Sequence, residues 1–300
     1  MDNKKLKSEN TKLVIAISSR ALFNLDQSHK IFKEKGIEAY AKHQQENEHV
    51  ILEPGVGFTL VKKLLKLNSK KTPIDVILLS RNSADTGLRI FNSIEHYDLN
   101  ISRAAFTRGE STHPFVGAFE ADLFLSSNYN DVQKALQSGY AAASIVESKS
   151  NNSHPSQLRI AFDGDAVIFS DESERIFQEK GLEAFHANEI LSEKIELKAG
   201  PFKSFLVSLQ KIQSTFPEED NPIRTALVTA RSAPSHRRVI HTMRKWGIRI
   251  DESFFLGGLE KGVFLRQFAA DIFFDDQQQH CESASQYVPT GHVPSGIKNS

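Results

Sequence analysis

The sequence has little of the features that place a chain in a specialised class. The single cysteine, Cys281, excludes an internal disulfide, and the neighbouring His280 lacks the partners and spacing of a zinc site. No apolar run approaches membrane-spanning length, and residues 13–17 are too short a run for a signal-peptide core. Basic and acidic residues are equal at 37 each, so no net charge attracts nucleic acid or an anionic membrane. We therefore expect a globular protein of the reducing cytoplasm, with neither nucleic acid nor membrane as a partner.

The sequence contains an internal repeat. The segment IFKEKGIEAY at residues 31–40 returns as IFQEKGLEAF at residues 176–185, an offset of 145 positions. The same offset aligns residues 13–23 with 158–168, and an offset of 149 aligns 119–127 with 268–276. Such self-similarity indicates two structural units of one design. We predict a disordered N-terminus at 1–12, a first half at 13–146, a polar linker at 147–156 and a second half at 157–300.

The two halves differ in their carboxylates. Four aspartates of the second half lie opposite non-acidic residues of the first: Asp163, Asp165, Asp275 and Asp276 against Ser18, Arg20, Ser126 and Ser127. The apolar frame around them is shared, as packing demands, so chemistry is the simplest use for the carboxylates. We predict a catalytic second half and a degenerate first half. That first half is either a structural partner, which the sequence favours, or a site that keeps affinity for an anion or nucleotide.

Both halves alternate β-type runs with helix-type periodicity, which is typical of a parallel sheet covered by helices. In the second half we expect strands at 158–162, 225–228, 254–256 and 272–274, and helices at 173–185, 201–212 and 234–246. The segment 170–222 is long enough for a small helical cap that closes on a ligand. Asp163, Thr229 and Asp275 each come at the end of an expected strand, where sheets of this kind bind ligands.

Several aspartates at one edge would repel one another unless a cation neutralised them. Carboxylate oxygens with room for water favour Mg²⁺, and a phosphoryl group would complete its shell. Asp163 is then a candidate nucleophile, and Asp165 a candidate acid and base. The candidates for binding phosphate offer a flexible turn, a hydroxyl with backbone donors, and a cation: Gly164, Thr229, Ala230 and Lys261. The candidate metal ligands are Asp163, Asp165, Asp275 and Asp276.

These motifs resemble a known superfamily. D-x-D-x-V after one strand, Thr after a second, Lys after a third and Asp-Asp after a fourth are similar to the haloacid dehalogenase superfamily of phosphatases. Three longer segments are similar to the cytosolic type I 5'-nucleotidases: FDGDAVIFSDESERI from Phe162, PIRTALVTARSA from Pro222 and IFFDDQ from Ile272. The resemblance implies a Rossmann-like parallel sheet of the haloacid dehalogenase type. It also implies Asp163 as nucleophile, Asp165 as acid and base, Thr229 and Lys261 as phosphate ligands, and Asp275 with Asp276 at the metal.

By this resemblance the protein is a 5'-nucleotidase that hydrolyses AMP-like nucleoside 5'-monophosphates through an aspartyl-phosphate intermediate with Mg²⁺. Two alternatives stay open: a sugar-phosphate phosphatase or phosphotransferase of the same superfamily, and a non-catalytic nucleotide-sensing protein. Base and sugar preference, allosteric activation and oligomeric state, a homo-oligomer included, are not determined by these residues. The sequence also leaves open which of Asp275 and Asp276 contacts the metal directly.

Overall fold

The computed structural model describes residues 12–69, 72–146, 148 and 154–299. Residues 1–11 of the expected disordered N-terminus, and most of the expected linker at 147–156, lie outside the described residues. Within the described part, no helix combines the length and the apolar character that crossing a membrane requires.

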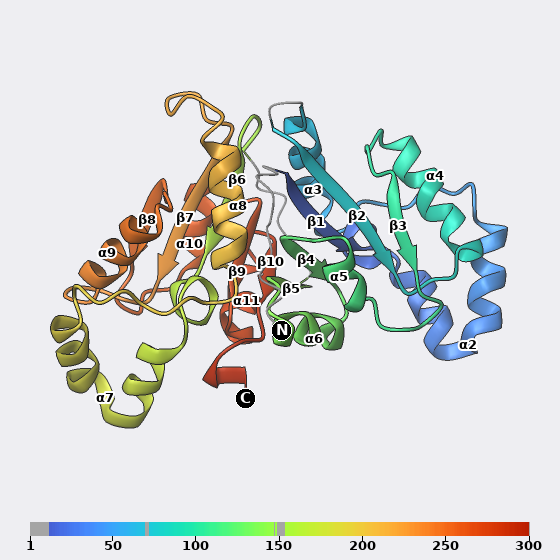
Figure 1. Ribbon diagram of the computed structural model, residues 1–300. Helices are drawn as coiled ribbons and strands as arrows, with labels where there is room; N and C mark the ends of the chain where they lie inside the picture. Colours follow the sequence, from blue (N-terminus) through green and yellow to red (C-terminus); the bar gives the residue numbers. More distant parts are fainter. Residues whose placement is uncertain (1–11, 70–71, 147, 149–153, 300) are drawn as a thin grey trace, which may run out of the picture.

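The described chain forms a ten-stranded sheet in the order β3-β2-β1-β4-β5-β10-β9-β6-β7-β8, with helices packed on it (Figure 1). Neighbouring strands run parallel except β5 and β10, which run antiparallel. This confirms the predicted α/β class with a mostly parallel central sheet. The strands are β1 (Leu13–Ser18), β2 (Ile74–Ser80), β3 (Arg103–Phe106), β4 (Leu123–Ser126), β5 (Ala142–Val146), β6 (Leu158–Phe162), β7 (Ile223–Thr229), β8 (Glu252–Phe255), β9 (Ile272–Asp275) and β10 (Thr290–His292).

Helices connect the strands. They are α1 (Ser19–Leu22), α2 (Asp26–Glu46), α3 (Phe58–Leu67), α4 (Leu88–His96), α5 (Pro114–Ala118), α6 (Tyr129–Gln137), α7 (Glu172–Leu191), α8 (Lys203–Gln213), α9 (His236–Trp246), α10 (Gly262–Phe268) and α11 (Gln278–Ala284). The strands and helices expected in the second half are present, with shifted ends. Gly247 ends α9 in the left-handed conformation, as a glycine after a helix predicts. The short β10 was not predicted, because three residues with a central glycine carry no alternation.

The antiparallel pair β5–β10 joins two five-stranded halves, β3-β2-β1-β4-β5 and β10-β9-β6-β7-β8. Its register aligns the carboxyl ends of strands from both halves. Ser126 pairs with Ser144, Ser144 with His292, and His292 with Asp275. These four residues form one row across the sheet, about 14 Å wide at three strand spacings. The edge of the first half and the edge of the second therefore meet near the centre of the sheet.

A cluster of phenylalanines fills the core behind the carboxyl end of β6. The rings of Phe162 and Phe274 lie 5.7 Å apart, and those of Phe202 and Phe274 lie 4.8 Å apart. All three side chains are fully buried. Such packing holds the ends of β6 and β9 in fixed positions, because close-packed cores deform little. Phe169, another residue near the candidate nucleophile, is also buried and packs on Trp246.

Helix α7 projects from the sheet, whereas α8 lies against it (Figure 1). Leu206, Leu209 and Ile212 of α8 are buried in the main core. By contrast, Phe177 and Leu182 of α7 are 43% and 55% exposed, so the apolar residues of this helix do not reach that core. Of the segment 170–222, which the sequence predicts to be a helical cap, α7 projects from the sheet, whereas α8 uses its apolar face to cover the sheet.

A buried ion pair links the two halves next to the start of β9. Lys63 of α3 donates to both carboxylate oxygens of Asp271, at 2.7 and 2.9 Å, and to the carbonyls of His154 and Gln157. The Asp271 side chain is fully buried and the Lys63 side chain is 15% exposed. Because the two residues come from different halves, their contact contributes to holding the halves together.

We expect Lys63→Ala to lower the free energy of unfolding by about 3 kcal/mol, because Asp271 keeps its buried charge without this cation. Urea unfolding at pH 7 measures the change. Lys66→Ala is the matched control, since Lys66 lies exposed on the same helix. Equal effects of the two substitutions would contradict a role of the pair in stability.

Candidate active site

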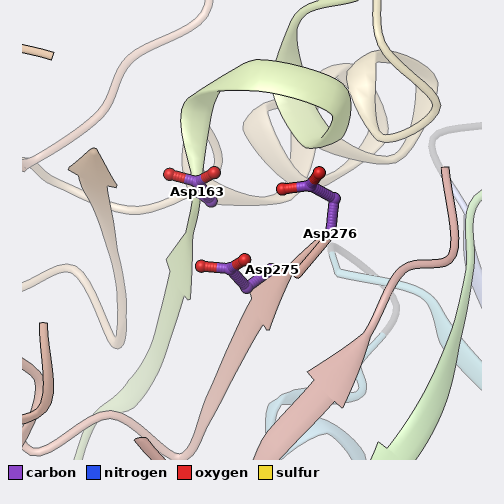
Figure 2. Close-up of side chains that lie close together, drawn as sticks. All are labelled: Asp163, Asp275 and Asp276. Atoms are coloured by element: carbon purple, nitrogen blue, oxygen red, sulfur yellow. The ribbon is translucent and has the colours of Figure 1, made fainter. Parts of the chain in front are cut away.

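Three aspartates from two neighbouring strands come together at the carboxyl edge of the second half (Figure 2). Asp163 follows β6, Asp275 ends β9, and Asp276 comes next in the chain. One carboxylate oxygen from each lies within 4.8 Å of the others, and all three residues are buried. The edge thus gathers three acidic groups away from bulk water, where their charges repel strongly.

Lys261 supplies the cation that is nearest to this cluster. Its Nζ lies 2.8 Å from Asp163 Oδ1 and 2.6 Å from Asp275 Oδ2. Burial opposes the charge of Lys261, but the two carboxylates outweigh it and leave the pKa of the ammonium group raised. Burial likewise opposes the charge of Asp275, yet Lys261 and His280 hold its pKa at about 2. Lys261 and Asp275 therefore form a charged pair at neutral pH.

The other two carboxylates are less well neutralised. Burial, with Asp275 nearby, raises the pKa of Asp163 to about 6 in spite of Lys261. Burial and the charges of Asp163 and Asp275 raise the pKa of Asp276 to about 9. Among the described residues, no side chain donates a hydrogen bond to the Asp276 carboxylate. The cluster as it stands has more carboxylates than cations.

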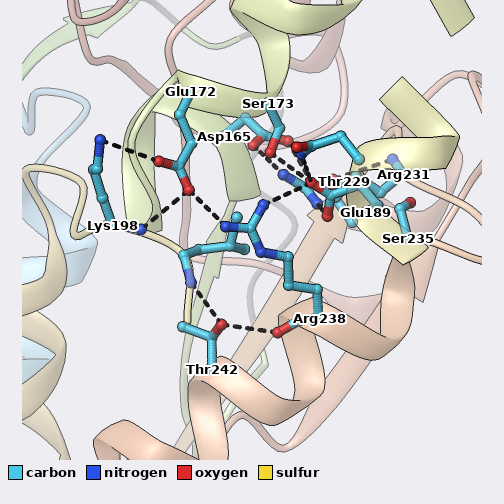
Figure 3. Close-up of polar contacts among 12 residues, drawn as sticks. Asp165, Glu172, Ser173, Glu189, Lys198, Thr229, Arg231, Ser235, Arg238 and Thr242 are labelled. Atoms are coloured by element: carbon cyan, nitrogen blue, oxygen red, sulfur yellow. Dashed lines mark hydrogen bonds and ion pairs between the residues drawn. The ribbon is translucent and has the colours of Figure 1, made fainter. Parts of the chain in front are cut away.

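Asp165 lies beside the cluster with its carboxylate engaged elsewhere (Figure 3). Nε and Nη2 of Arg231 each donate to one of its oxygens at 2.7 Å. Of the four aspartates expected at the metal, three therefore cluster, while the side chain of Asp165 is turned to the guanidinium of Arg231. Two parallel charge-assisted hydrogen bonds fix the orientation of this carboxylate.

Arg231 is held in turn by α7. Its Nη1 donates to Glu189 Oε2 at 2.6 Å, and Arg238 Nη1 donates to Glu189 Oε1 at 2.9 Å. Ser173, near the start of α7, also donates to Glu189 Oε1 at 2.9 Å. A fully buried carboxylate between two arginines thus ties both ends of α7 to the loop after β7 and to α9.

Sequence reasoning missed this network. Arg231 comes two residues after Thr229 within a motif that the sequence had already singled out, and that closeness was the available signal. Glu189 gave no signal, because charged residues on helices usually face solvent. For the same reason the basic run at 236–238 is interpreted from the sequence as a solvated helix face, which is wrong for Arg238, because this residue is buried. His280, which the sequence analysis rejects as a zinc ligand, lies near the cluster, with its Nδ1 3.3 Å from Asp275 Oδ2.

The predicted residues line one small cavity of about 50 Å³. Those in its wall are Asp163, Asp165, Thr229, Ala230, Lys261 and Asp276. Asp275 lies behind the wall and acts on it through Lys261. Gly164 also lies behind, where an added Cβ would come within 3.2 Å of Thr229 Oγ1, so glycine keeps that hydroxyl in place. Every residue expected from the sequence is therefore at, or directly behind, this one cavity.

The C-terminal residues close the outer side of the same cavity. Ile297 lines it and donates its backbone N–H to Asp171 Oδ2 at 2.8 Å. Lys298 lies 3.3 Å from Glu174, and the Asn299 side chain donates to the Asp276 carbonyl at 2.8 Å. These contacts hold residues 297–299 beside the cavity and position the backbone of Asp276.

Comparison with known proteins identifies the family of the chain. A model of the 5'-nucleotidase family matches residues 5–300. Human cytosolic 5'-nucleotidase 1B is 40% identical over 288 residues, which cover 91% of this chain and 47% of that protein. The chain thus spans about half the length of this curated relative, and no solved structure matches it. The chain belongs to the 5'-nucleotidase family.

Proposed function

We propose that this chain hydrolyses nucleoside 5'-monophosphates to nucleoside and phosphate, in the cytoplasm. The observation that carries the proposal is the cluster of Asp163, Asp275 and Asp276 with Lys261 at one end of the sheet. A cation and a phosphoryl group would complete its charge balance. Membership of the 5'-nucleotidase family supports the substrate class, and the name of the human relative supports the compartment.

The fold proposed for this activity is a haloacid-dehalogenase-type sheet that occurs twice, once in degenerate form. Contacts at matching positions support the duplication. Ser28 donates to Gln44 Oε1, and Ser173 donates to Glu189 Oε1. Each residue of the second pair lies 145 positions after its counterpart in the first pair. Gly36 and Gly181 interrupt α2 and α7 with the same left-handed φ, 80° and 79°.

Strand register supports the duplication independently. Ile17 of β1 pairs with Leu78 and Leu125. At the offsets found in the sequence, Ile17 corresponds to Phe162, Leu78 to Leu227 and Leu125 to Phe274. Phe162 of β6 pairs with both Leu227 and Phe274, as this correspondence requires. A frame that keeps both its strand order and its register is what two copies of one unit would retain.

The residues of the cluster fit Mg²⁺. The donors are all carboxylate oxygens, which hard divalent cations prefer, and they converge within 4.8 Å. The raised pKa values of Asp163 and Asp276 arise from burial and mutual repulsion, which a cation relieves. Asp276 is the better placed direct ligand, because Asp275 is already paired with Lys261 and accepts from the Gln277 N–H. When bound, Mg²⁺ would neutralise charge on the carboxylates and on the phosphoryl group.

In the proposed reaction, Asp165 enters the first step as the carboxylic acid. An oxygen of Asp163 attacks phosphorus and displaces the 5'-oxygen of the nucleoside, which takes the proton of Asp165. Water then gives a proton to Asp165 and attacks the aspartyl phosphate, releasing phosphate and restoring Asp163. Lys261 and Thr229 hold the phosphoryl oxygens through charge and hydroxyl. Asp165 reaches the leaving oxygen when one of its two hydrogen bonds with Arg231 is replaced by a hydrogen bond to that oxygen.

We expect Asp163→Asn to lower the rate of phosphate release from AMP at least about 10³-fold, because the amide cannot form the covalent intermediate. AMP binding should remain, and chelation of Mg²⁺ should stop the wild-type enzyme. Phosphate release measured with Mg²⁺ and with EDTA tests both points. Asp220→Asn is the control, since Asp220 is exposed and outside the cavity. Turnover of Asp163→Asn near the wild-type rate would refute the nucleophile.

We expect Mg²⁺ binding to release protons and to strengthen as pH rises from 6 to 8. A carboxylate whose pKa is raised holds its proton at neutral pH, and the cation must displace that proton. One displaced proton changes the affinity by about tenfold per pH unit. Calorimetric titration in two buffers of different ionisation enthalpy counts the protons. Asp276→Asn should abolish most of the release, and a proton count of zero for the wild type would rule out the raised pKa.

We expect Arg231→Ala to lower kcat by about 10- to 100-fold with little change in KM, because Asp165 loses the hydrogen bonds that orient it. Steady-state kinetics with AMP separates the two constants. Arg237→Ala serves as control, since the Arg237 side chain is 63% exposed and pairs only with Glu193 among the described residues. A change confined to KM would show that Arg231 binds substrate rather than positions Asp165.

A further inference from the structure

A second and larger cavity, of about 710 Å³, lies at the carboxyl edge of the first half. Its floor includes Ser18, Ser126 and Ser127, which stand where the second half has Asp163, Asp275 and Asp276. Helix α2, which occupies the position of the cap helix α7 in the first half, supplies one wall. The volume is within the range of sites that enclose a small organic ligand.

Charge distinguishes the two cavities. The first is lined by three arginines, Arg20, Arg81 and Arg108, and by two aspartates, Asp85 and Asp131. The catalytic cavity is lined by one lysine and five carboxylates: Lys261 against Asp163, Asp165, Asp171, Glu174 and Asp276. Arg81 is paired with Asp131 and Arg20 with Asp26, so Arg108 is the arginine of this cavity without an ion pair to a described residue. The first cavity therefore carries a small positive excess without any metal, whereas the second carries an excess of carboxylates that repels an anion until a cation is bound.

Donors in the first cavity lack partners within the described residues. Arg20 Nε and Asn82 Nδ2 are buried and make no hydrogen bond. Tyr40 donates to Asn82 Oδ1 at 2.8 Å, which orients the amide. Arg108 is exposed and makes no ion pair with a described residue. Because buried donors without acceptors are costly, these groups indicate a ligand that brings acceptor oxygens.

The wall formed by α2 is apolar and aromatic. Phe32 and Ile37 are 45% and 62% exposed, and Tyr40 packs edge-on against Phe32 with 6.0 Å between ring centroids. His29 stacks on the same Phe32 ring, with 6.3 Å between the ring centroids. A ligand with a flat ring at one end and an anionic group at the other matches both parts of this cavity.

We propose that the cavity of the first half binds a nucleoside phosphate and does not hydrolyse it. Ser18 replaces the nucleophile, and its hydroxyl already accepts hydrogen bonds from the N–H groups of Ala21 and Ser127. Asp131 is held by two hydrogen bonds from Arg81, at 2.9 and 2.7 Å, and by Thr112. The first half thus keeps the means to bind but not those to form a phosphoenzyme. This inference does not depend on the activity proposed above.

Calorimetric titration of the wild-type chain with AMP in EDTA tests the proposal, because the catalytic cavity then lacks its cation. We expect one AMP bound per chain, with adenosine, ribose 5-phosphate and inorganic phosphate each binding at least about tenfold more weakly. Absence of AMP binding in EDTA overturns the proposal. Phosphate or ribose 5-phosphate binding as tightly as AMP overturns the nucleoside part of it. If the wild-type chain did not hydrolyse AMP with Mg²⁺, the proposed activity would be refuted, but the binding proposal would stand.

Substitutions assign the bound AMP to one of the two cavities. Arg108→Asn removes a charge at a left-handed position, φ 49°, that asparagine tolerates, and Ser127→Asp restores a carboxylate to the floor. We expect each to weaken AMP binding in EDTA by about tenfold or more, with an unchanged midpoint of thermal unfolding. Arg244→Asn, on the exposed face of α9, is the matched control, and Lys261→Met in the catalytic cavity should leave this binding unchanged. If Lys261→Met lost AMP binding while Arg108→Asn and Ser127→Asp kept it, the assignment to the first cavity would be refuted.

Discussion

The crowding of three buried carboxylates around a single lysine is the constraint on which the site depends. Lys261 neutralises Asp275 and part of the charge of Asp163, and no cation of the described chain pairs with Asp276. Such an arrangement costs stability in the isolated chain and becomes favourable when a cation and a phosphoryl group are added. The phenylalanine core behind β6 and β9 holds the carboxylates in this position, so the packing of the fold maintains what electrostatics alone would disperse.

Control of Asp165 is separate from the cluster. Its carboxylate is oriented by Arg231, Arg231 is held by Glu189, and Glu189 belongs to the helix that projects over the site. The chain of contacts makes the orientation of the proposed acid and base depend on the position of α7. A helix with exposed apolar side chains is thus anchored by acidic residues at both of its ends, Glu172 paired with Arg238 and the buried Glu189 paired with Arg231 and Arg238.

The two halves show how one frame serves two chemical settings. Strand order, register and the glycine interruption of α2 and α7 recur, while the residues at the carboxyl edges differ in charge. Serines of the first half stand where the second half has aspartates, and three arginines line the cavity beside them. The row formed by Ser126, Ser144, His292 and Asp275 brings the two edges close together at the centre of one sheet.

Sequence alone determined the α/β class, the presence of the strands in the second half and three clustered aspartates among four candidates, because hydrophobic periodicity and motif order are local properties of the chain. It also placed Thr229, Ala230 and Lys261 at the same edge, since parallel strands end on one side. Only the tertiary structure decided that Asp165 is turned to Arg231, that α8 belongs to the core, and that β10 joins the halves. These outcomes depend on contacts between residues far apart in the chain, and the periodicity of a single segment contains no record of them.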